Sequence, residues 1–416
     1  MASHGDAFCI RSVKPQWVQP ANVPQTENFD FGEALSQVEP LLDLIFRYLP
    51  TRDLKSCLKV SPSWKERAEG ALGRRNAPSW CTCYRVTSKG HKSNVIQHSP
   101  NLNYNNIQLG IFIYDSCRWK LTKCVCVHSN ISELSRKYVP EYLEEELVPG
   151  EVEYCLLSVN RVVSYFGGTR TTEDIQTHGS IFEGVLIPKI PSVRTVLFHC
   201  NPTCKKGELK NTISKYVGEN DEAKCILIFL KTQLYEPVSN LLEFLVPKGQ
   251  PSPVALGGGI IRGTKTFQHV STDPKVIPAK DAVCIAFLKD KTSDLDNFRA
   301  YSRVLKKGSY GDDMSKEELE AELLEFKRLV ILKKHSLGFR FSCVENYQRN
   351  ELESFKAVFP GLPLLGSEVR GEIGWNSCTN EPEEDQPGKH KRKRRKKDHP
   401  VPQHFYSTIF VLVTWD

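Results

Sequence analysis

The sequence has no apolar run long enough to span a membrane or to act as a secretory signal. Its longest apolar runs include Cys225–Leu230 and Ile409–Val413, which have the length of buried strands. The opening residues also lack the apolar stretch of a signal peptide. Fourteen cysteines without such a signal are expected to be reduced thiols. We therefore expect an intracellular protein that does not enter a membrane.

Recognisable catalytic motifs are also missing. The sequence contains neither Gly-x-Ser-x-Gly nor His-Glu-x-x-His, and its eleven histidines are scattered. No cysteine can be singled out as a nucleophile, Cys343 included, because nothing in the sequence indicates a lowered thiol pKa. We expect a non-catalytic protein with no catalytic residues and no cofactor of its own.

Short cysteine groups could suggest a metal site. In a strand, residues two apart share a face, so two Cys-x-Cys pairs on neighbouring strands could converge on zinc. Structural zinc sites mostly use a wider spacing on a turn, however, so we expect small core residues and no metal. The groups are Cys81 with Cys83, Cys124 with Cys126, and Cys200 with Cys204 beside His199.

The net charge of +7 is concentrated in one segment. Eight lysines and arginines lie between residues 389 and 397, directly after an acidic stretch, so the rest of the chain is nearly neutral. A nearly neutral body argues against a broad nucleic-acid-binding face. Like charges repel, so we expect a disordered insertion over about 376–404, whose basic part suits a nuclear-localisation signal. A purely solvated loop and a nucleic-acid patch are the alternatives, and we expect the protein in both cytoplasm and nucleus. The expected signal residues are Lys389, Lys391, Arg392, Lys393, Arg394, Arg395, Lys396 and Lys397.

The composition is that of a globular protein with two or three domains, since 40% of the 416 residues are hydrophobic and 25% are charged. Residues 1–32 have no periodic pattern and are expected to be a disordered tail. Residues 33–80 are predicted to form a small helical module, joined through Gly73–Asn76 as linker to a strand-rich body over 81–416. The body is expected to divide near residue 290. The predicted fold class is α+β, a three-helix module followed by a larger mixed α/β domain with central β-sheets.

Three short helices are predicted between Leu35 and Leu72. Pro50 ends the first because it lacks an N–H group, and Thr51 is placed to cap the second. Ser61 suits the cap of the third helix, where proline is tolerated at the first position. Apolar residues recur along one face of each helix: Leu41, Leu42, Ile45, Phe46 and Leu49, then Leu54, then Trp64, Ala68 and Leu72.

So small a module cannot bury enough surface to be comfortably stable alone, and exposed apolar residues there suggest a partner. Its pattern, Leu-Leu-x-x-Ile-Phe-x-Tyr-Leu-Pro-x-x-Asp-Leu from Leu41 onward, resembles the F-box. F-boxes usually open with Leu-Pro, where this sequence has Gln37 and Val38. The resemblance implies docking on Skp1 and, through it, on a cullin-RING ubiquitin ligase. The docking residues that it implies are Leu41, Leu42, Ile45, Phe46, Leu49, Pro50, Leu54, Val60 and Trp64.

Strand and helix patterns alternate beyond Trp80. The run Cys225–Leu230 is expected to be central in a sheet, because it is apolar at every position. Ser315–Lys334 is predicted as a helix that opens with a capping box of Ser315 and Glu318 and ends with two lysines. The other predicted helices are 141–147, 236–246, 295–305 and 351–359. The other predicted strands are 81–86, 109–114, 121–127, 153–159, 181–187, 193–199, 254–256, 282–288, 338–343 and 405–415.

A glycine run follows the strand predicted at 254–256. Gly257, Gly258 and Gly259 favour a tight turn, and the backbone N–H groups of such a run could alternatively cradle a small ligand such as a phosphate. The run is not a P-loop, because its lysine falls at Lys265 rather than beside the last glycine.

Part of the body resembles the FIST domain, which occurs in bacterial signalling proteins and is proposed there to sense small ligands. An F-box joined to a FIST region implies a substrate receptor that holds a protein for ubiquitination and proteasomal degradation. The alternatives are a small-ligand sensor and a nuclear nucleic-acid-binding protein that uses residues 389–397. The segments that carry the resemblance are Cys225–Phe229, Ala255–Gly259, Gly338–Cys343, Phe359–Gly366 and Gly371–Gly374.

Overall fold

The computed structural model describes most of the chain as a mixed α/β protein. It divides into two units, Met1–Tyr48 and Leu49–Asp416. In the first unit it describes the helix α2 (Glu39–Tyr48). The described residues are 39–88, 91–115, 139–149, 151–166, 180–231, 236–246, 253–270, 273–278, 282–306, 314–345, 350–378 and 402–416.

The second unit begins with two helices, α3 (Thr51–Cys57) and α4 (Pro62–Gly73). The α4 start is as predicted, since Pro62 is the first helical residue and the Ser61 hydroxyl accepts a hydrogen bond from the Trp64 N–H group. The prediction for α3 was wrong in one respect. Thr51 is itself helical, and Pro50 is the N-cap, because the threonine hydroxyl binds elsewhere in the chain.

Within the described residues, the strands of the second unit form three sheets. One has the order β10-β9-β4-β3-β5-β1-β2, the second β16-β15-β8-β7-β11-β6, and the third β12-β17-β13-β14. The strands of the first are β1 (Ser79–Ser88), β2 (His91–His98), β3 (Ile107–Asp115), β4 (Glu153–Val159), β5 (Ser180–Pro188), β9 (Gly263–Val270) and β10 (Asp273–Pro278). Those of the second are β6 (Val193–Cys200), β7 (Asp221–Leu230), β8 (Ala255–Ile260), β11 (Ala282–Asp290), β15 (Glu372–Ile373) and β16 (Gln403–His404). The third contains β12 (Phe298–Lys306), β13 (His335–Cys343), β14 (Leu364–Val369) and β17 (Ser407–Trp415).

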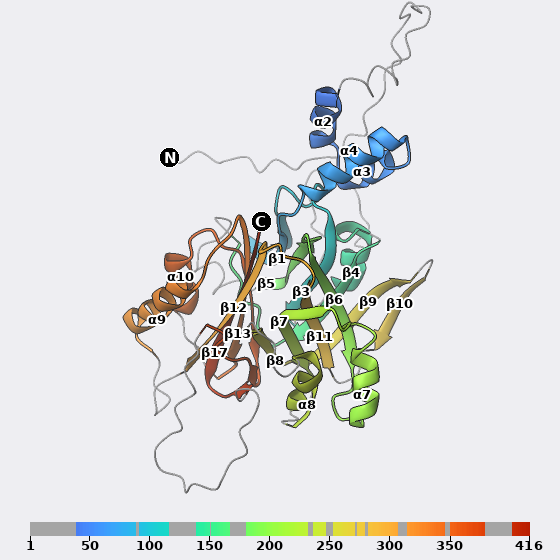
Figure 1. Cartoon of the computed structure of the whole chain (residues 1–416). Helices are drawn as coiled ribbons and strands as arrows, with labels where there is room; N and C mark the ends of the chain where they lie inside the picture. Colours follow the sequence, from blue (N-terminus) through green and yellow to red (C-terminus); the bar gives the residue numbers. More distant parts are fainter. Residues whose placement is uncertain are drawn as a thin grey trace, which may run out of the picture. The chain divides into compact units, whose positions relative to one another are not determined.

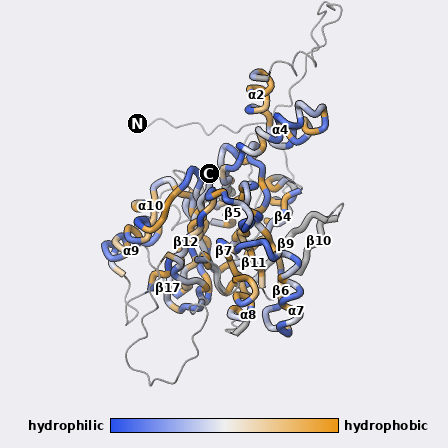
Figure 2. Tube along the Cα trace, in the orientation of Figure 1, coloured by the Kyte–Doolittle hydropathy of each residue, from blue (hydrophilic) through white to orange (hydrophobic). Residues whose placement is uncertain are grey.

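The three sheets share one central core, to which each contributes one face. Helices cover the outer faces: α5 (Val139–Tyr142) and the π-helical turn η1 (Leu143–Leu147) on the first sheet, α7 (Lys206–Ile213) and α8 (Glu236–Leu245) on the second, and α9 (Lys316–Leu329) and α10 (Glu351–Val358) on the third. Figure 1 shows α9 and α10 beside β12, β13 and β17, away from α7 and α8. The hydrophobic colour in Figure 2 is concentrated on inner strands such as β7 and β11. The predicted α+β class is confirmed at this level.

Strand β7 illustrates why fully apolar runs lie at the centre. Cys225, Leu227 and Phe229 face the central core, whereas the alternate residues Ile226 and Ile228 face the helices α7 and α8. The strand pairs in parallel with β8 and antiparallel with β11, so both its edges and both its faces are covered. The central position predicted for this run is confirmed.

The predicted helix over 295–305 is wrong, because residues 298–306 form β12. All nine residues of β12 pair with β17, from Phe298 opposite Trp415 to Lys306 opposite Ser407. The pattern also has the period of a strand, since Phe298 and Val304 face the central core while Leu305 faces α9. Tertiary pairing therefore overrides the local helical pattern.

Helix α9 begins as predicted and ends earlier. Ser315 and Glu318 form the predicted capping box. The helix ends at Leu329, so Lys333 and Lys334 lie beyond it, and the basic residues of its last turn are Lys327 and Arg328.

The glycine run is not a turn. Gly257, Gly258 and Gly259 lie within strand β8, where they allow neighbouring backbone and side chains to approach closely. A Cβ atom on Gly257 would lie 2.4 Å from the Val411 side chain of the third sheet, and one on Gly258 would lie 1.9 Å from the Ile228 carbonyl oxygen. The turn prediction was wrong because these glycines are needed for close packing, of Gly257 and Gly259 against the third sheet and of Gly258 against the neighbouring strand β7, which no local pattern records.

Several predictions lie outside the described residues. These are the tail over 1–32, the strand over 121–127 with Cys124 and Cys126, and the basic segment from Lys389 to Lys397. The remaining predicted strands and helices are present, with ends shifted by a few residues. Strands β2, β9, β10, β14, β15 and β16 and helix α7 were not predicted.

Candidate functional site

Helix α2 carries an exposed apolar face in the first unit. Leu41, Leu44 and Tyr48 are 41%, 48% and 74% exposed and follow one another at spacings of three and four residues. Leu42 and Phe46, on another side of the helix, are fully buried. The predicted docking residues of this helix therefore separate into exposed Leu41 and buried Leu42 and Phe46. Ile45, also predicted, is half-buried.

The predicted residues of α3 and α4 separate in the same way. Leu54 is fully buried, Cys57 beside it is nearly so, and burial raises the pKa of this thiol. Val60, in the turn between α3 and α4, is 61% exposed. The other predicted residues here, Leu49, Pro50 and Trp64, are half-buried.

Thr51 joins the start of α3 to the loop before β3. Its N–H group donates to the Asn103 carbonyl oxygen at 2.9 Å, and its hydroxyl donates to the Tyr104 carbonyl oxygen at 2.6 Å. The Arg75 guanidinium lies over the Tyr104 ring, 5.8 Å from its centre, and also donates to the Thr51 hydroxyl at 3.4 Å. On the exposed side, Lys55 forms an ion pair of 2.9 Å with Glu151. Hydrogen bonds of Thr51, the first residue of α3, and contacts of Arg75, after α4, thus hold the two helices against the body.

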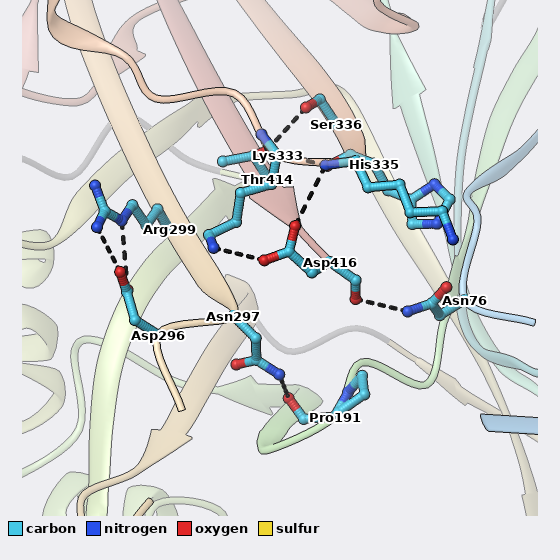
Figure 3. A network of polar contacts seen from close by, with 11 residues as sticks. Asn76, Pro191, Asp296, Asn297, Arg299, Lys333, His335, Ser336, Thr414 and Asp416 are labelled. Atoms are coloured by element: carbon cyan, nitrogen blue, oxygen red, sulfur yellow. Dashed lines mark hydrogen bonds and ion pairs between the residues drawn. The ribbon is translucent and has the colours of Figure 1, made fainter. Parts of the chain in front are cut away.

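Asn76, which follows α4, binds the C-terminal end of β17. Its side-chain amide donates to the Asp416 carbonyl oxygen at 2.7 Å, and its own carbonyl oxygen accepts from the Trp415 indole N–H group at 2.7 Å. Asn76 is 6% exposed and Trp415 is fully buried. Figure 3 shows Asp416 bound by Asn76 and by Lys333. The segment Gly73–Asn76, expected to be a linker, ends in a buried contact with the body.

Charged side chains near the C-terminal end of β17 are held in ion pairs. The hydrogen bond from Lys333 holds the pKa of the Asp416 carboxyl below its usual range, and Arg299 does the same for Asp296. Burial, with Lys334 nearby, lowers the pKa of His335, whose ring lies against Trp415. His335 is therefore neutral at pH 7 and adds no charge to the junction.

A buried carboxyl group lies at the opposite end of β17. Glu372 is fully buried and accepts a hydrogen bond of 3.1 Å from Ser407, with the Cys343 thiol beside it. Burial raises the pKa of Glu372 to about 7, and burial also raises the pKa of Cys343. Cys343 is thus a protonated thiol at neutral pH.

A second buried polar group lies between the third sheet and α10. The Arg340 guanidinium donates two hydrogen bonds to the Glu351 carboxylate, one from Nε at 2.7 Å and one from Nη2. The Thr408 hydroxyl donates to the same carboxylate at 2.6 Å. All three side chains are at most 4% exposed. This pair was not predicted, although a charged residue that alternates with phenylalanines in Gly338–Cys343 is a signal of a buried partner.

The cysteine groups show no metal site among the residues that the structure describes. Cys81 and Cys83 are fully buried in β1. The Cys200 sulfur lies 4.0 Å from that of Cys284 on the neighbouring strand rather than in a group with Cys204. None of the helices in the described ranges is long and apolar enough to cross a membrane. The ligand prediction for Gly257, Gly258 and Gly259 stays a prediction.

Comparison with known proteins finds distant relatives. No family model matches the chain. The chain is 22% identical to F-box only protein 22 of Homo sapiens over 357 residues, which covers 82% of this chain and 85% of that protein. It is 21% identical over 356 residues to F-box only protein 22 of Pongo abelii, with the same coverage. This distant similarity over most of both chains supports an F-box-protein-like relationship, whereas the FIST resemblance stays a prediction.

Proposed function

We propose that this protein is the substrate-recognition subunit of a Skp1–cullin–F-box ubiquitin ligase. It docks on Skp1 through the module that begins at α2, and its body holds a protein substrate. Ubiquitin transfer belongs to an enzyme that the ligase recruits, so the chain needs no catalytic residue or cofactor. The distant similarity to F-box only protein 22 supports this proposal.

The observation that carries the proposal is the exposed apolar face of α2. Leu41, Leu44 and Tyr48 expose apolar surface on one side of a ten-residue helix, within the segment whose pattern resembles an F-box. Such surface on a small helical module favours burial against a partner. Leu42, Phe46 and Leu54 are already buried in the structure of this chain, so we assign them to its stability and not to docking.

Skp1 affinity tests the proposal directly. Replacing Leu41, Leu44 and Tyr48 together with alanine removes roughly 1 kcal/mol of apolar burial per side chain, which predicts an affinity about a hundredfold weaker. The measurement is isothermal titration of the purified full chain with Skp1. Leu324→Ala is the matched control, because Leu324 is 46% exposed on α9, and this variant should bind like wild type. An unchanged affinity in a triple variant with an unchanged helical circular dichroism signal would refute the docking assignment.

Import through the basic segment is the second part of the proposal. The charges from Lys389 to Lys397 suit recognition by an import receptor. Changing Arg392, Arg394 and Arg395 to alanine should lower the nuclear fraction of a fluorescent fusion and leave Skp1 affinity unchanged. The same nuclear fraction in variant and wild type would remove the assignment. If the segment instead binds nucleic acid, affinity for DNA or RNA should fall steeply with salt and be lost in the same variant.

A further inference from the structure

The segment between α9 and β13, residues 330–334, has a fixed backbone. The Ile331 N–H group donates to the Tyr301 hydroxyl at 3.2 Å, and the Lys333 N–H group donates to the Thr414 hydroxyl at 2.7 Å. The Lys333 ammonium also binds the Asp416 carboxylate at 2.6 Å, as Figure 3 shows. The segment is therefore held against β12 and β17 of the third sheet by backbone hydrogen bonds and an ion pair.

Apolar side chains of this segment, and of the last residue of α9, nevertheless point to solvent. Leu329, Ile331 and Leu332 are between 39% and 56% exposed, whereas Val330 between them is buried. Leu295, in the loop that leads into β12, is also 56% exposed, and the Asn297 carbonyl oxygen in that loop accepts from the Asp416 N–H group at 3.1 Å. Because the backbone is fixed, folding back cannot hide these side chains, and this favours a partner that covers them.

Positive charge lies at both ends of the apolar residues. Arg328 and Lys334 are exposed, and among the described residues neither side chain has an ion pair or a hydrogen bond. The acidic groups nearby already have ion-pair partners within the fold, although two of them share one guanidinium. Glu322 and Glu325 bind Arg303, Asp416 binds Lys333, and Asp296 binds Arg299. The surface therefore presents apolar residues between two cations that have no ion-pair partner among the described residues.

We propose that residues 328–334 bind an extended acidic segment of the substrate protein, in which two or three leucine-like residues lie between carboxylates. The apolar residues of that segment cover Ile331 and Leu332, and its carboxylates pair with Arg328 and Lys334. These two cations are six positions apart, at most about 20 Å, so the carboxylates of an extended segment are about five residues apart. The inference rests on the proposed function, because it names the substrate chemistry that the body recognises.

Fluorescence anisotropy with one defined peptide tests the inference on the full chain. The probe is a fluorescein-labelled peptide, GSEDLSLLDESG, and the reference probe is GSKKLSLLKKSG. We expect saturable binding of the acidic probe only, weakened as salt rises from about 50 to 500 mM because exposed charges are screened. Both Arg328→Glu with Lys334→Glu and Ile331→Ser with Leu332→Ser should weaken binding about tenfold or more. Lys210→Glu with Lys215→Glu is the matched control, since both lysines are exposed around α7 on another sheet.

Each outcome decides the inference. Loss of binding in both surface variants with retention in the control supports it. No binding of the acidic probe, or equal binding by the surface variants, overturns it. A wild-type dimer in light scattering that becomes monomeric in the Ile331→Ser, Leu332→Ser variant also overturns it, because a second copy then covers the surface. Skp1 affinity is measured separately on every variant, so failure here is distinguishable from failure of the docking proposal.

Discussion

Replacing Trp415 with phenylalanine should loosen the attachment of α3 and α4 to the body. The indole N–H group of this fully buried residue donates to the Asn76 carbonyl oxygen at 2.7 Å. Phenylalanine keeps most of the ring and removes the donor, which leaves a buried carbonyl group without its partner. That loss costs about 2 kcal/mol. The smaller ring leaves a cavity that costs about 1 kcal/mol more, so the free energy of unfolding should fall by about 3 kcal/mol.

Urea unfolding measures this loss, as a lower midpoint at unchanged slope. Trp80→Phe is the matched control. Trp80 stacks on Phe166 with ring centres 5.2 Å apart, and among the described residues its indole has no hydrogen bond in the structure, so the substitution removes ring volume without removing a bond. Amide hydrogen exchange should also become faster over residues 49–76 in the Trp415 variant. If the two variants unfold at the same midpoint and exchange alike, the Asn76 contact does not hold the segment in place.

Three further changes probe the interior. Burial raises the pKa of Glu372 to about 7 in the folded protein, against an ordinary 4.5, so the folded state holds the carboxyl proton more tightly than the unfolded state. The free energy of unfolding should therefore decline between about pH 4.5 and 7. Glu372→Gln should flatten that decline in urea melts across this range. Gly257→Ala should destabilise by about 2 kcal/mol because its Cβ atom meets Val411, and Val411→Ala in the same chain should restore part of the loss if the clash is the cause. Arg340→Met should lower the free energy of unfolding by about 3–5 kcal/mol, because it leaves the Glu351 carboxylate buried without its partner. Adding Glu351→Leu should recover most of this loss in the same melts. If the losses of the two single variants simply add in the double variant, the two side chains do not form a direct pair.

Much of the fold could be predicted because its signals are local. The apolar run of β7 and the capping box of α9 depend on residues a few positions apart, and both were predicted. Strand β12 and the glycines of β8 could not, because their states are set by β17 and by the facing sheet. Asn76 and Asp416, which are hydrogen-bonded, lie 340 positions apart in the sequence, and no local sequence pattern can predict such a contact.

The candidate docking face was predicted in part. Leu41 was identified from its helical spacing and is exposed, whereas Leu44 and Tyr48 were missed. Their signal was available, since Leu41, Leu44 and Tyr48 recur at the helical period. The side of the helix with Leu42 and Phe46 has the clearer apolar periodicity. Such periodicity indicates which side chains are buried and does not identify exposed ones.

The position of β17 determines when this protein can finish folding during synthesis. β17 lies between β12 and β13, and it leaves the ribosome after every other described strand. Until it emerges, the third sheet lacks its middle strand, the central core is open on that side, and Asn76 has no Trp415 to bind. Pairings between such distant segments form slowly. The helices that begin the second unit therefore become fixed only after β17 has been made, so a product that lacks β17 would leave its core exposed and be recognised by chaperones.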